Sequence, residues 1–166
     1  MIMRKFFILA IVTLLFAGCS SDDEPNTKEN TDKEVAALAD MLNGAFFGER
    51  YSSVLNYTEH EDITFHPFIQ PRENVSYFGT FTAYGVATVM RYVNDLSDTP
   101  SYNKTCLYTF GTGTRNEITL SFYECVENWE VRNKEDRRII VVDSESSFKM
   151  HHYGETADNA LTYSRR

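Results

Sequence analysis

Basic residues are scarce in this chain, and no stretch of it gathers them beyond pairs. Of 166 residues, 16 are Lys or Arg and 24 are Asp or Glu, so the formal net charge is −8. Because phosphate binding needs a basic surface, this balance argues against a nucleic-acid partner. Glycine is also infrequent, with 8 residues, and no heptad stripe or period of 20 to 50 residues recurs, which excludes collagen, a coiled coil and a solenoid. At 42% hydrophobic content the chain is too apolar to be disordered, and its length fits one domain.

No apolar run is long enough to span a membrane. The strongest one follows Arg4-Lys5, covers residues 6–16 and ends before Ala17-Gly18-Cys19. As a helix this run extends about 17 Å at ~1.5 Å per residue, against ~30 Å of hydrocarbon in a bilayer. A short apolar run between a basic pair and small residues is typical of a signal peptide. We therefore expect residues 1–18 to be removed from the mature protein.

The residues that end this run resemble the bacterial lipobox, in which the cysteine, here Cys19, is acylated and becomes the first mature residue. Phe16 stands where leucine is commonest in that motif. The next residues, Ser20-Ser21-Asp22-Asp23-Glu24, resemble the acidic export tag of surface lipoproteins from Bacteroidetes. The resemblance implies a membrane partner held through the lipid on Cys19, and a place on the outer membrane exposed at the cell surface. The alternatives are an ordinary secretory signal with a chance cysteine and a solvated acidic linker.

A disordered tether and one helix are expected before the main domain. Residues 19–31 are the lipidated cysteine and a polar tether, and residues 32–166 form the folded domain. The sequence Thr31-Asp32-Lys33-Glu34 fits a capping box. Val35, Leu38 and Leu42 follow at helical spacing, and Gly44 supplies a stop signal. The apolar stripe is narrow, so the helix should lie on the domain and not inside it.

After Gly44 the hydrophobic period changes from 3.6 to 2. Apolar and polar residues alternate in segments such as 63–66 and 118–123, which predicts eight or nine strands. Turn signals separate the strands, among them Glu59-His60-Glu61, Pro71-Arg72-Glu73-Asn74 and Asn133-Lys134-Glu135-Asp136. Connections this short cannot contain crossover helices, so the strands must be antiparallel. Because closure removes exposed edges, we predict an all-β fold: a small antiparallel meander barrel with one short N-terminal helix.

This arrangement resembles the lipocalin-like lipoproteins of Bacteroidetes. The resemblance lies in the short helix, in Gly44-Ala45-Phe46 at the first long strand, and in a meander that ends in Leu161-Thr162-Tyr163-Ser164-Arg165. Such domains carry Gly-x-Trp at the first strand and a basic residue on the last strand that packs over the Trp. This chain has Phe46 in place of the Trp. The resemblance implies a barrel whose interior or mouth takes an apolar or amphipathic small molecule.

The two cysteines of the domain, Cys106 and Cys125, suggest a disulfide in an oxidising compartment, but strand register argues against it. If the even-numbered residues of both strands face one core, Phe110 pairs with Ile118 and Cys106 pairs with Phe122. Cys125 then points to the opposite face, whereas a disulfide needs Cβ atoms about 4 Å apart on one face. A bulge beside Cys125 would restore the pairing, so both alternatives stay open.

Motifs that carry catalysis or metal binding are missing from the sequence. His60, His66, His151 and His152 do not follow any metal-site spacing, and the adjacent pair must face opposite ways on a strand. There is no Gly-x-Ser-x-Gly nucleophile motif, and the Gly111-x-Gly113 pair precedes a strand instead of a helix. We therefore expect a protein that is not an enzyme and that uses no cofactor or metal.

Aromatic residues are abundant, at 14% of the chain, and many fall inside predicted strands. They either fill the barrel as a core or line a cavity for a ligand. The odd-numbered row of residues 47–57 mixes aromatic rings with a carboxylate and a hydroxyl, a composition that suits a wet pocket. The candidate ligand-binding residues are Phe47, Glu49, Tyr51, Tyr57, Tyr84 and Trp129.

Two functional hypotheses follow from these features. The first is a surface-anchored, non-enzymatic lipoprotein that binds a small amphipathic or apolar ligand in its barrel. The second is a structural or interaction lipoprotein whose barrel is filled and whose loops bind a protein partner. A cavity above about 300 Å³ inside the barrel would favour the first hypothesis.

Overall fold

The computed structural model describes residues 27–52, 57–92, 99–113, 115 and 117–166. The predicted signal peptide, Cys19 and most of the predicted tether therefore lie outside the described residues. In chain order the elements are α2 (Thr27–Met41), β1 (Gly44–Ser52), β2 (Tyr57–Ser76), β3 (Gly79–Tyr92), β4 (Tyr102–Thr112), β5 (Ile118–Cys125), the short 3-10 helix η2 (Glu127–Trp129), β6 (Val131–Ser144), β7 (Ser147–His152), a second 3-10 helix η3 (Ala157–Asn159) and β8 (Leu161–Arg165).

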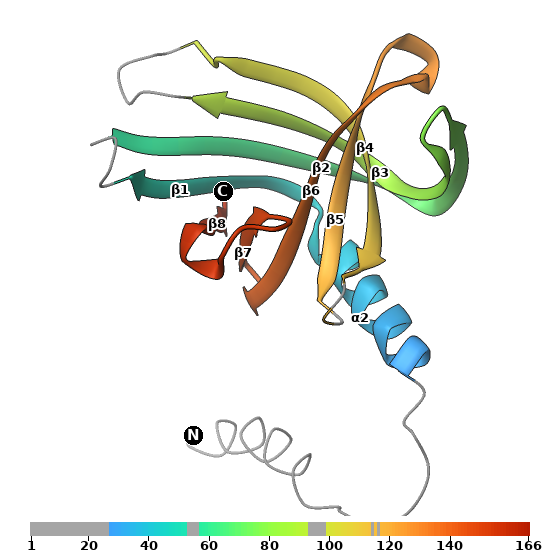
Figure 1. The fold of residues 1–166 in the computed structure, drawn as a ribbon, viewed down its shortest axis with the longest axis horizontal. Coiled ribbons are helices and arrows are strands. Elements are labelled where there is room, and N and C mark those ends of the chain that lie inside the picture. Colours follow the sequence, from blue (N-terminus) through green and yellow to red (C-terminus); the bar gives the residue numbers. More distant parts are fainter. Residues whose placement is uncertain (1–26, 53–56, 93–98, 114, 116) are drawn as a thin grey trace, which may run out of the picture.

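Eight antiparallel strands in the described part of the chain form one closed barrel, with α2 beside one end of it (Figure 1). Each strand pairs with the next one along the chain, and β8 pairs with β1 to close the barrel. The predicted all-β meander barrel with one short N-terminal helix is therefore confirmed, and it is consistent with a lipocalin-like fold. Neither α2 nor the two 3-10 helices among the described residues is long and apolar enough to cross a membrane.

Three of the predicted turns are wrong, because the strands run on through them. Residues 59–61 and 71–74 belong to β2, and residues 133–136 belong to β6. The ladder is built by backbone groups, so charged side chains do not end a strand when they can face solvent or one another. The polar signal near residue 71 instead marks a bulge, where the register shifts between Pro67 and Arg72.

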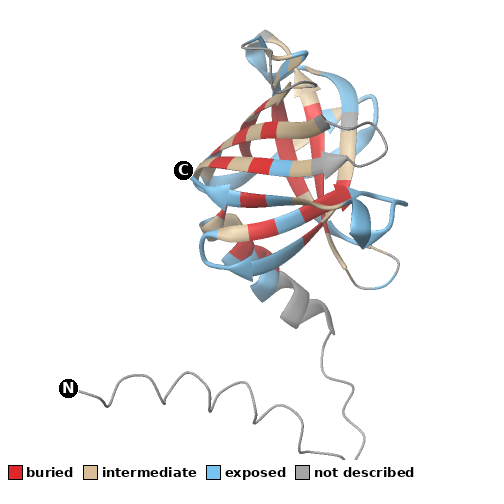
Figure 2. Ribbon diagram, turned by 90° about the vertical axis from the view of Figure 1, so that its left-hand side faces the viewer, coloured by how far each residue is buried: buried red, intermediate tan, exposed pale blue. Residues whose placement is uncertain are grey.

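Alternate residues of every strand meet in one interior, as the period of two predicts. Phe46 pairs with Ile63, Phe65 with Ala87 and Tyr108 with Phe122, and all six side chains are buried. Buried and more exposed positions alternate along several strands in Figure 2, whereas β4 and β5 bury consecutive residues at 106–109 and 119–123. Gly48 continues the interior row of β1, and a Cβ atom there would lie 2.4 Å from the ring of Tyr163. The missing side chain of Gly48 thus leaves room for that ring.

Helix α2 begins at Thr27, so the capping box predicted at Thr31 is wrong. The preceding turn contains Lys28 and Glu29, which are good helix formers, and the helix extends over it. The predicted apolar stripe is confirmed: Val35, Leu38 and Leu42 are buried, and Leu38 and Leu42 pack into the barrel core. The helix ends at Met41, and Gly44 adopts a φ of 108°, a left-handed conformation that a glycine adopts without strain.

Cys106 and Cys125 are not joined by a disulfide, and they face different clusters. Cys106 is in the barrel interior, and Cys125 packs with Tyr123 and Val131 in a second apolar cluster. The predicted hairpin register is wrong by two residues, because Cys106 pairs with Glu124 instead of Phe122. Parity is unchanged by a shift of two, so the placement of the two thiols on different faces holds.

Candidate functional site

The candidate residues on β1 face outward and not into the barrel. Phe46 and Gly48 take the interior positions, which leaves Phe47 and Glu49 on the outer surface. The Phe47 ring stacks on His60 with centroids 5.3 Å apart. The wet pocket inside the barrel expected from this odd-numbered row is therefore not found at these two positions. Their part in ligand binding stays a prediction.

The other candidates lie on separate elements. Tyr51 and Tyr57 belong to β1 and β2, and their side chains lie outside the described residues. Tyr84 is half-buried on β3, with its ring 4.9 Å from Phe110 in an edge contact. Trp129 ends η2 at the β5–β6 turn and is exposed. The structure does not bring Tyr84 and Trp129 together with the β1 pair in one pocket.

An aromatic cluster fills the middle of the barrel. The Phe46 ring lies 4.9 Å from Phe148, and Phe148 stacks on Tyr163 at 5.0 Å. Phe65 meets Tyr108 edge-on at 5.2 Å. Rings at these separations are in van der Waals contact, so the middle of the barrel is a packed core. Among the described residues, one pocket lies towards each end of the barrel.

The helix-covered end holds an apolar pocket of about 450 Å³. It lies between α2 and strands β5 and β6, and Val142, about half exposed, forms part of its wall. Its lining is mostly aliphatic, with carboxylates and a hydroxyl at the edge: Glu34, Ala37, Leu38, Met41, Ile118, Ile140, Val142, Ser144 and Glu145. A pocket of this volume and composition suits a small apolar or amphipathic molecule. We call it the helix-end pocket.

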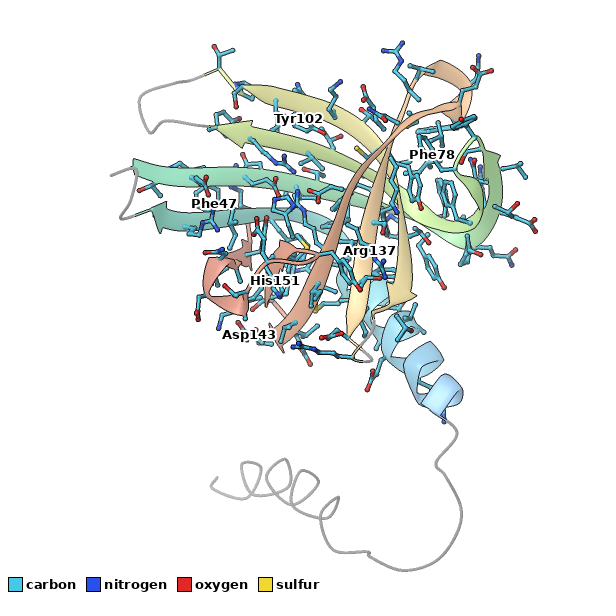
Figure 3. All side chains as sticks on the ribbon, viewed as in Figure 1. Phe47, Phe78, Tyr102, Arg137, Asp143 and His151 are labelled. Atoms are coloured by element: carbon cyan, nitrogen blue, oxygen red, sulfur yellow. The ribbon has the colours of Figure 1, made fainter. Side chains whose placement is uncertain are left out.

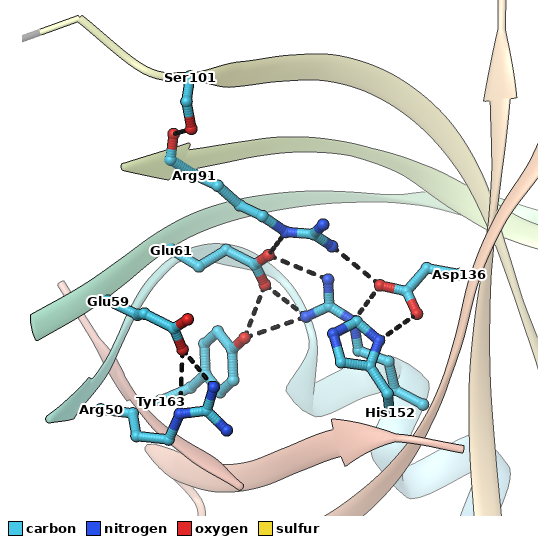
Figure 4. A network of polar contacts seen from close by, with 9 residues as sticks. Arg50, Glu59, Glu61, Arg91, Ser101, Asp136, His152 and Tyr163 are labelled. Atoms are coloured by element: carbon cyan, nitrogen blue, oxygen red, sulfur yellow. Dashed lines mark hydrogen bonds and ion pairs between the residues drawn. The ribbon is translucent and has the colours of Figure 1, made fainter. Parts of the chain in front are cut away.

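Beyond the aromatic cluster, the other half of the barrel holds a ring of four charges (Figure 4). Arg138 donates to both carboxylate oxygens of Glu61, and each of these residues is 3% exposed. Arg91 donates from Nε to Glu61 and from Nη2 to Asp136 at 2.9 Å. Arg138 Nε donates to the same Asp136 oxygen at 2.8 Å. The ring therefore joins β2, β3 and β6 across the barrel.

Two further side chains attach to this ring. The Tyr163 hydroxyl donates to Glu61 at 2.6 Å and accepts from Arg138 Nη1 at 3.0 Å. His152 Nδ1 lies 2.7 Å from the second oxygen of Asp136. These contacts bring β7 and β8 into the network, so five of the eight strands contribute a side chain to it.

The ring keeps its carboxylates ionised. Burial alone would raise the pKa of Glu61, but Arg138 and Arg91 lower it to about 2. The pKa of Asp136 is lowered too, because the contacts with His152 and Arg138 outweigh its burial. Burial, and then the Glu61 charge, raises the pKa of Tyr163, so its hydroxyl keeps its proton. The ring is thus zwitterionic at neutral pH and needs no ligand to balance it.

A polar cavity of about 300 Å³ opens above this ring. Its lining is Arg50, Glu59, His60, Glu61, Arg91, Tyr92, Arg138, His152, Glu155, Leu161 and Tyr163. Arg50 and Glu59 form an ion pair at its rim. This mixed and charge-balanced lining is unsuited to an apolar ligand, because such a ligand would remove hydration from charged groups without replacing it.

Sequence reasoning missed the charged ring because it assigned two of its segments to turns. The signal was present in the parity: Glu61 shares it with Ile63 and Phe65, and Arg138 shares it with Ile140. Extending these rows by one step would have placed both charges inside the barrel. Their pairing could not be foreseen, because 77 residues separate Glu61 from Arg138.

The histidines do not form a common site in the structure. His60 and His152 both line the polar cavity, whereas His151 is buried and contacts the His152 carbonyl through Nδ1. Over the residues that the structure describes, no group of three or more His, Cys, Asp or Glu side chains is arranged to hold a metal ion.

Comparison with known proteins adds no relative to this picture. The chain gives no significant match to a protein-family model, to a curated protein or to a solved structure.

Proposed function

We propose that the chain is a surface-anchored, non-enzymatic lipoprotein that binds a small apolar or amphipathic molecule in the helix-end pocket. The observation that carries the proposal is the volume of about 450 Å³ with an aliphatic lining at this end of the barrel. The pocket exceeds the size at which a barrel cavity accepts a small molecule. The polar cavity at the other end lacks the apolar lining that such a ligand needs.

The rim of the pocket limits the kind of ligand. Glu34 and Glu145 place two carboxylates at its edge, and a basic residue is not part of the lining. A ligand with an anionic head group would be repelled there, whereas a neutral or cationic head group would not. We therefore propose a neutral or cationic amphiphile in place of a fatty acid or a bile acid.

The anchor and the family are part of the same proposal. Acylation of Cys19 would hold the chain on the outer membrane, facing outward, as the resemblance to the lipobox and the acidic export tag implies. Membership of the lipocalin-like lipoproteins of Bacteroidetes is supported by the closed meander and by Arg165 of β8, whose guanidinium lies 4.9 Å from the Phe46 ring centroid. Intact mass of the protein from its own host tests acylation, and protease treatment of whole cells tests surface exposure.

A matched pair of substitutions tests the pocket. Val142 lines the helix-end pocket and is 48% exposed, while the adjacent Val141 is 51% exposed and does not line it. Val142→Asp places a charge in the apolar wall, and Val141→Asp places the same charge on the outer surface. Both residues are already half exposed, so the two variants should fold alike.

The neutral fluorescent amphiphile N-phenyl-1-naphthylamine serves as the probe. We expect saturable binding to the wild-type protein and to Val141→Asp, and at least about tenfold weaker binding to Val142→Asp. Ala37→Trp, which fills the pocket from the helix side, should weaken binding as well. Equal affinity of all four proteins would contradict the proposal.

Two observations favour a second candidate function, that of a structural or interaction lipoprotein. The middle of the barrel is packed with aromatic rings and the charged ring leaves no unbalanced charge, as expected of a scaffold. Native mass spectrometry of the protein purified from its host separates the two candidates. A retained small molecule supports ligand binding, and a retained protein without a small molecule supports the scaffold.

A further inference from the structure

Large apolar side chains are exposed at one side of the molecule, where the β2–β3 hairpin and the β5–β6 turn meet. The described residues include eight exposed large hydrophobic side chains, and five of them lie here. Ile69 is fully exposed and Tyr77 is 95% exposed, and Val75, Phe78 and Trp129 complete the set. Single exposed apolar residues are common, but a gathered set marks an interaction surface. We call these five residues the hairpin face.

The hairpin face rests on a rigid support. A second apolar cluster joins Phe68 and Phe81 of the hairpin to Tyr123 and to Val131 at the start of β6. The rings of Phe81 and Tyr123 are stacked, with centroids 4.1 Å apart and planes 8° from parallel. The β2–β3 hairpin and the β5–β6 turn are therefore held side by side. Figure 3 shows Phe78 at this side, away from Phe47 and the strands around it.

A bulge in β2 gives the face its most prominent residue. The strand register shifts between Pro67 and Arg72, and Ile69 lies in the segment between two prolines. Arg72 packs its guanidinium over the Phe68 ring at 4.6 Å, which holds the base of the bulge. Phe68 turns towards the second cluster while Ile69 is left in solvent. Among the described residues, the Ile69 side chain is fully exposed.

One residue of the hairpin face, Ile69, lies next to helix α2. Residues Ala36 and Ala39 of the helix and Phe68 and Ile69 of the bulge line one common groove of about 420 Å³. Only seven residues separate Cys19 from Thr27, where α2 begins. Extended, they span at most about 25 Å at 3.3–3.6 Å per residue. An acyl chain on Cys19 would therefore keep this side of the domain close to the membrane.

We propose that the hairpin face lies in the interfacial layer of the membrane to which the chain is anchored. The proposal rests on the anchor of the proposed function, and it adds a second membrane contact made by the folded domain itself. Tyr and Trp are the residues that membrane interfaces favour, because their rings are apolar and their polar atoms stay hydrated. Ile69 and Phe78 would supply the apolar insertion.

The shape of the face favours a membrane over a protein partner. Its residues lie at a bulge, at a hairpin turn and at a neighbouring turn, so they project from the barrel, as the β2–β3 hairpin does in Figure 1. Projecting side chains reach the headgroup region without any matching cavity in a partner. An amphipathic surface needs to enter only about 5–10 Å into that layer.

The chain contains a single tryptophan, Trp129, which reports on this contact without any label. The acylated protein is reconstituted into vesicles of phosphatidylethanolamine and phosphatidylglycerol, with a fraction of brominated acyl chains as quenchers. We expect a blue-shifted Trp129 emission that bromine quenches. The control is the double variant Trp129→Phe and Val141→Trp, which moves the single tryptophan to an exposed position on β6. Brominated lipid should not quench the emission of this tryptophan.

Removal of the lipid isolates the contribution of the face. In the mature chain with Cys19→Ala, Ile69→Asp should reduce vesicle partitioning at least about tenfold, and Val141→Asp should leave it unchanged. Ile69 is fully exposed, so the substitution should not disturb folding, which circular dichroism checks. Unquenched Trp129 in vesicle-bound protein, or equal partitioning of both variants, overturns the proposal. Binding of a protein to this face with Trp129 unquenched by lipid would also overturn it.

The two proposals can fail separately. Val142→Asp should weaken probe binding at least about tenfold and leave the quenching of Trp129 by brominated lipid intact. Ile69→Asp should leave probe binding intact and reduce that quenching. Loss of the acyl chain from the intact mass of host protein would instead remove the anchor on which the membrane contact rests.

Discussion

Arg165, at the end of β8, clamps the end of helix α2 while its guanidinium lies over the ring of Phe46. It donates from Nη1 to the Asn43 carbonyl at 2.6 Å and from Nη2 to the Met41 carbonyl at 2.8 Å. The last carbonyls of a helix lack partners within the helix and carry a partial negative charge. One cation therefore satisfies the helix end and covers an aromatic ring of the barrel.

Replacement of Arg165 tests this clamp. We expect Arg165→Ala to lower the free energy of unfolding by about 1–2 kcal/mol, through loss of charge-assisted hydrogen bonds and the cation–π contact. Arg166→Ala is the matched control, because Arg166 is exposed and lies over Phe47 on the outer surface. Urea denaturation measures both. Equal effects of the two substitutions would show that the clamp contributes nothing specific.

Removal of one charge from the buried ring should be costly. Glu61→Gln leaves Arg138 buried with one carboxylate partner fewer, and we expect a loss of about 3–5 kcal/mol in the free energy of unfolding. At the rim, Glu59→Gln breaks the partly exposed pair with Arg50 and should cost less than about 1 kcal/mol. Denaturant titration of both variants checks the difference. Similar costs for both would mean that burial of the ring is not decisive.

The lowered pKa of Glu61 predicts how the stability of the protein depends on pH. Arg138 and Arg91 hold the pKa of Glu61 at about 2 in the folded protein, below its ordinary value of 4.5. A lowered pKa adds stability that is complete above pH 4.5 and is lost as the pH falls through 4.5 towards 2. At 1.36 kcal/mol per pKa unit, the Glu61 contribution is about 3 kcal/mol, and the lowered pKa of Asp136 acts in the same direction.

Urea denaturation at pH 7, 5, 4 and 3 measures this dependence. Stability should be flat between pH 7 and 5 and should fall below that range. Glu61→Gln should show a shallower fall, because it lacks one of the two buried carboxylates. An unchanged slope in this variant would assign the acid sensitivity to other groups.

The two cysteines should differ in reactivity. Burial raises the pKa of Cys106 to about 12, so almost no thiolate forms at neutral pH. Cys125 is partly exposed, with its Sγ 3.5 Å from the Thr105 carbonyl, and should be alkylated slowly in the native protein. Cys106 should react only after denaturation. Peptide mass mapping after iodoacetamide treatment measures alkylation at both sites. A peptide linked through Cys106 and Cys125 would contradict the absence of a disulfide between them.

The alternation of apolar and polar residues after Gly44 predicted the barrel correctly, because residues two apart on a strand face the same side of the sheet. Once Ile63 and Phe65 face the core, every second residue of β2 before the bulge at Pro67 must face it as well. The same rule put Cys106 and Cys125 on different faces, even though the hairpin register was wrong by two residues. Errors arose where polar residues interrupted the pattern, as at residues 59–61, since a strand is continued by backbone pairing and not by its side chains.

The outward position of Phe47 was beyond the sequence for a related reason. Residues 46 and 47 are both phenylalanine, so parity alone does not show which of them faces the core. The choice follows from pairing with Ile63 of β2, and from Gly48, which leaves space for Tyr163 in the same interior row. When the sequence does not show which alternate residues of a strand face the core, a pocket predicted from that strand can be placed on the wrong face of the sheet.

The order of apolar and polar residues along the chain determined the all-β class, the antiparallel meander and the apolar stripe of α2, because each of these depends on neighbours in sequence. The charged ring, the helix-end pocket and the hairpin face were decided only by the closed barrel. They join residues from distant strands, and their energies depend on burial and on distances between side chains that exist only once β8 has paired with β1.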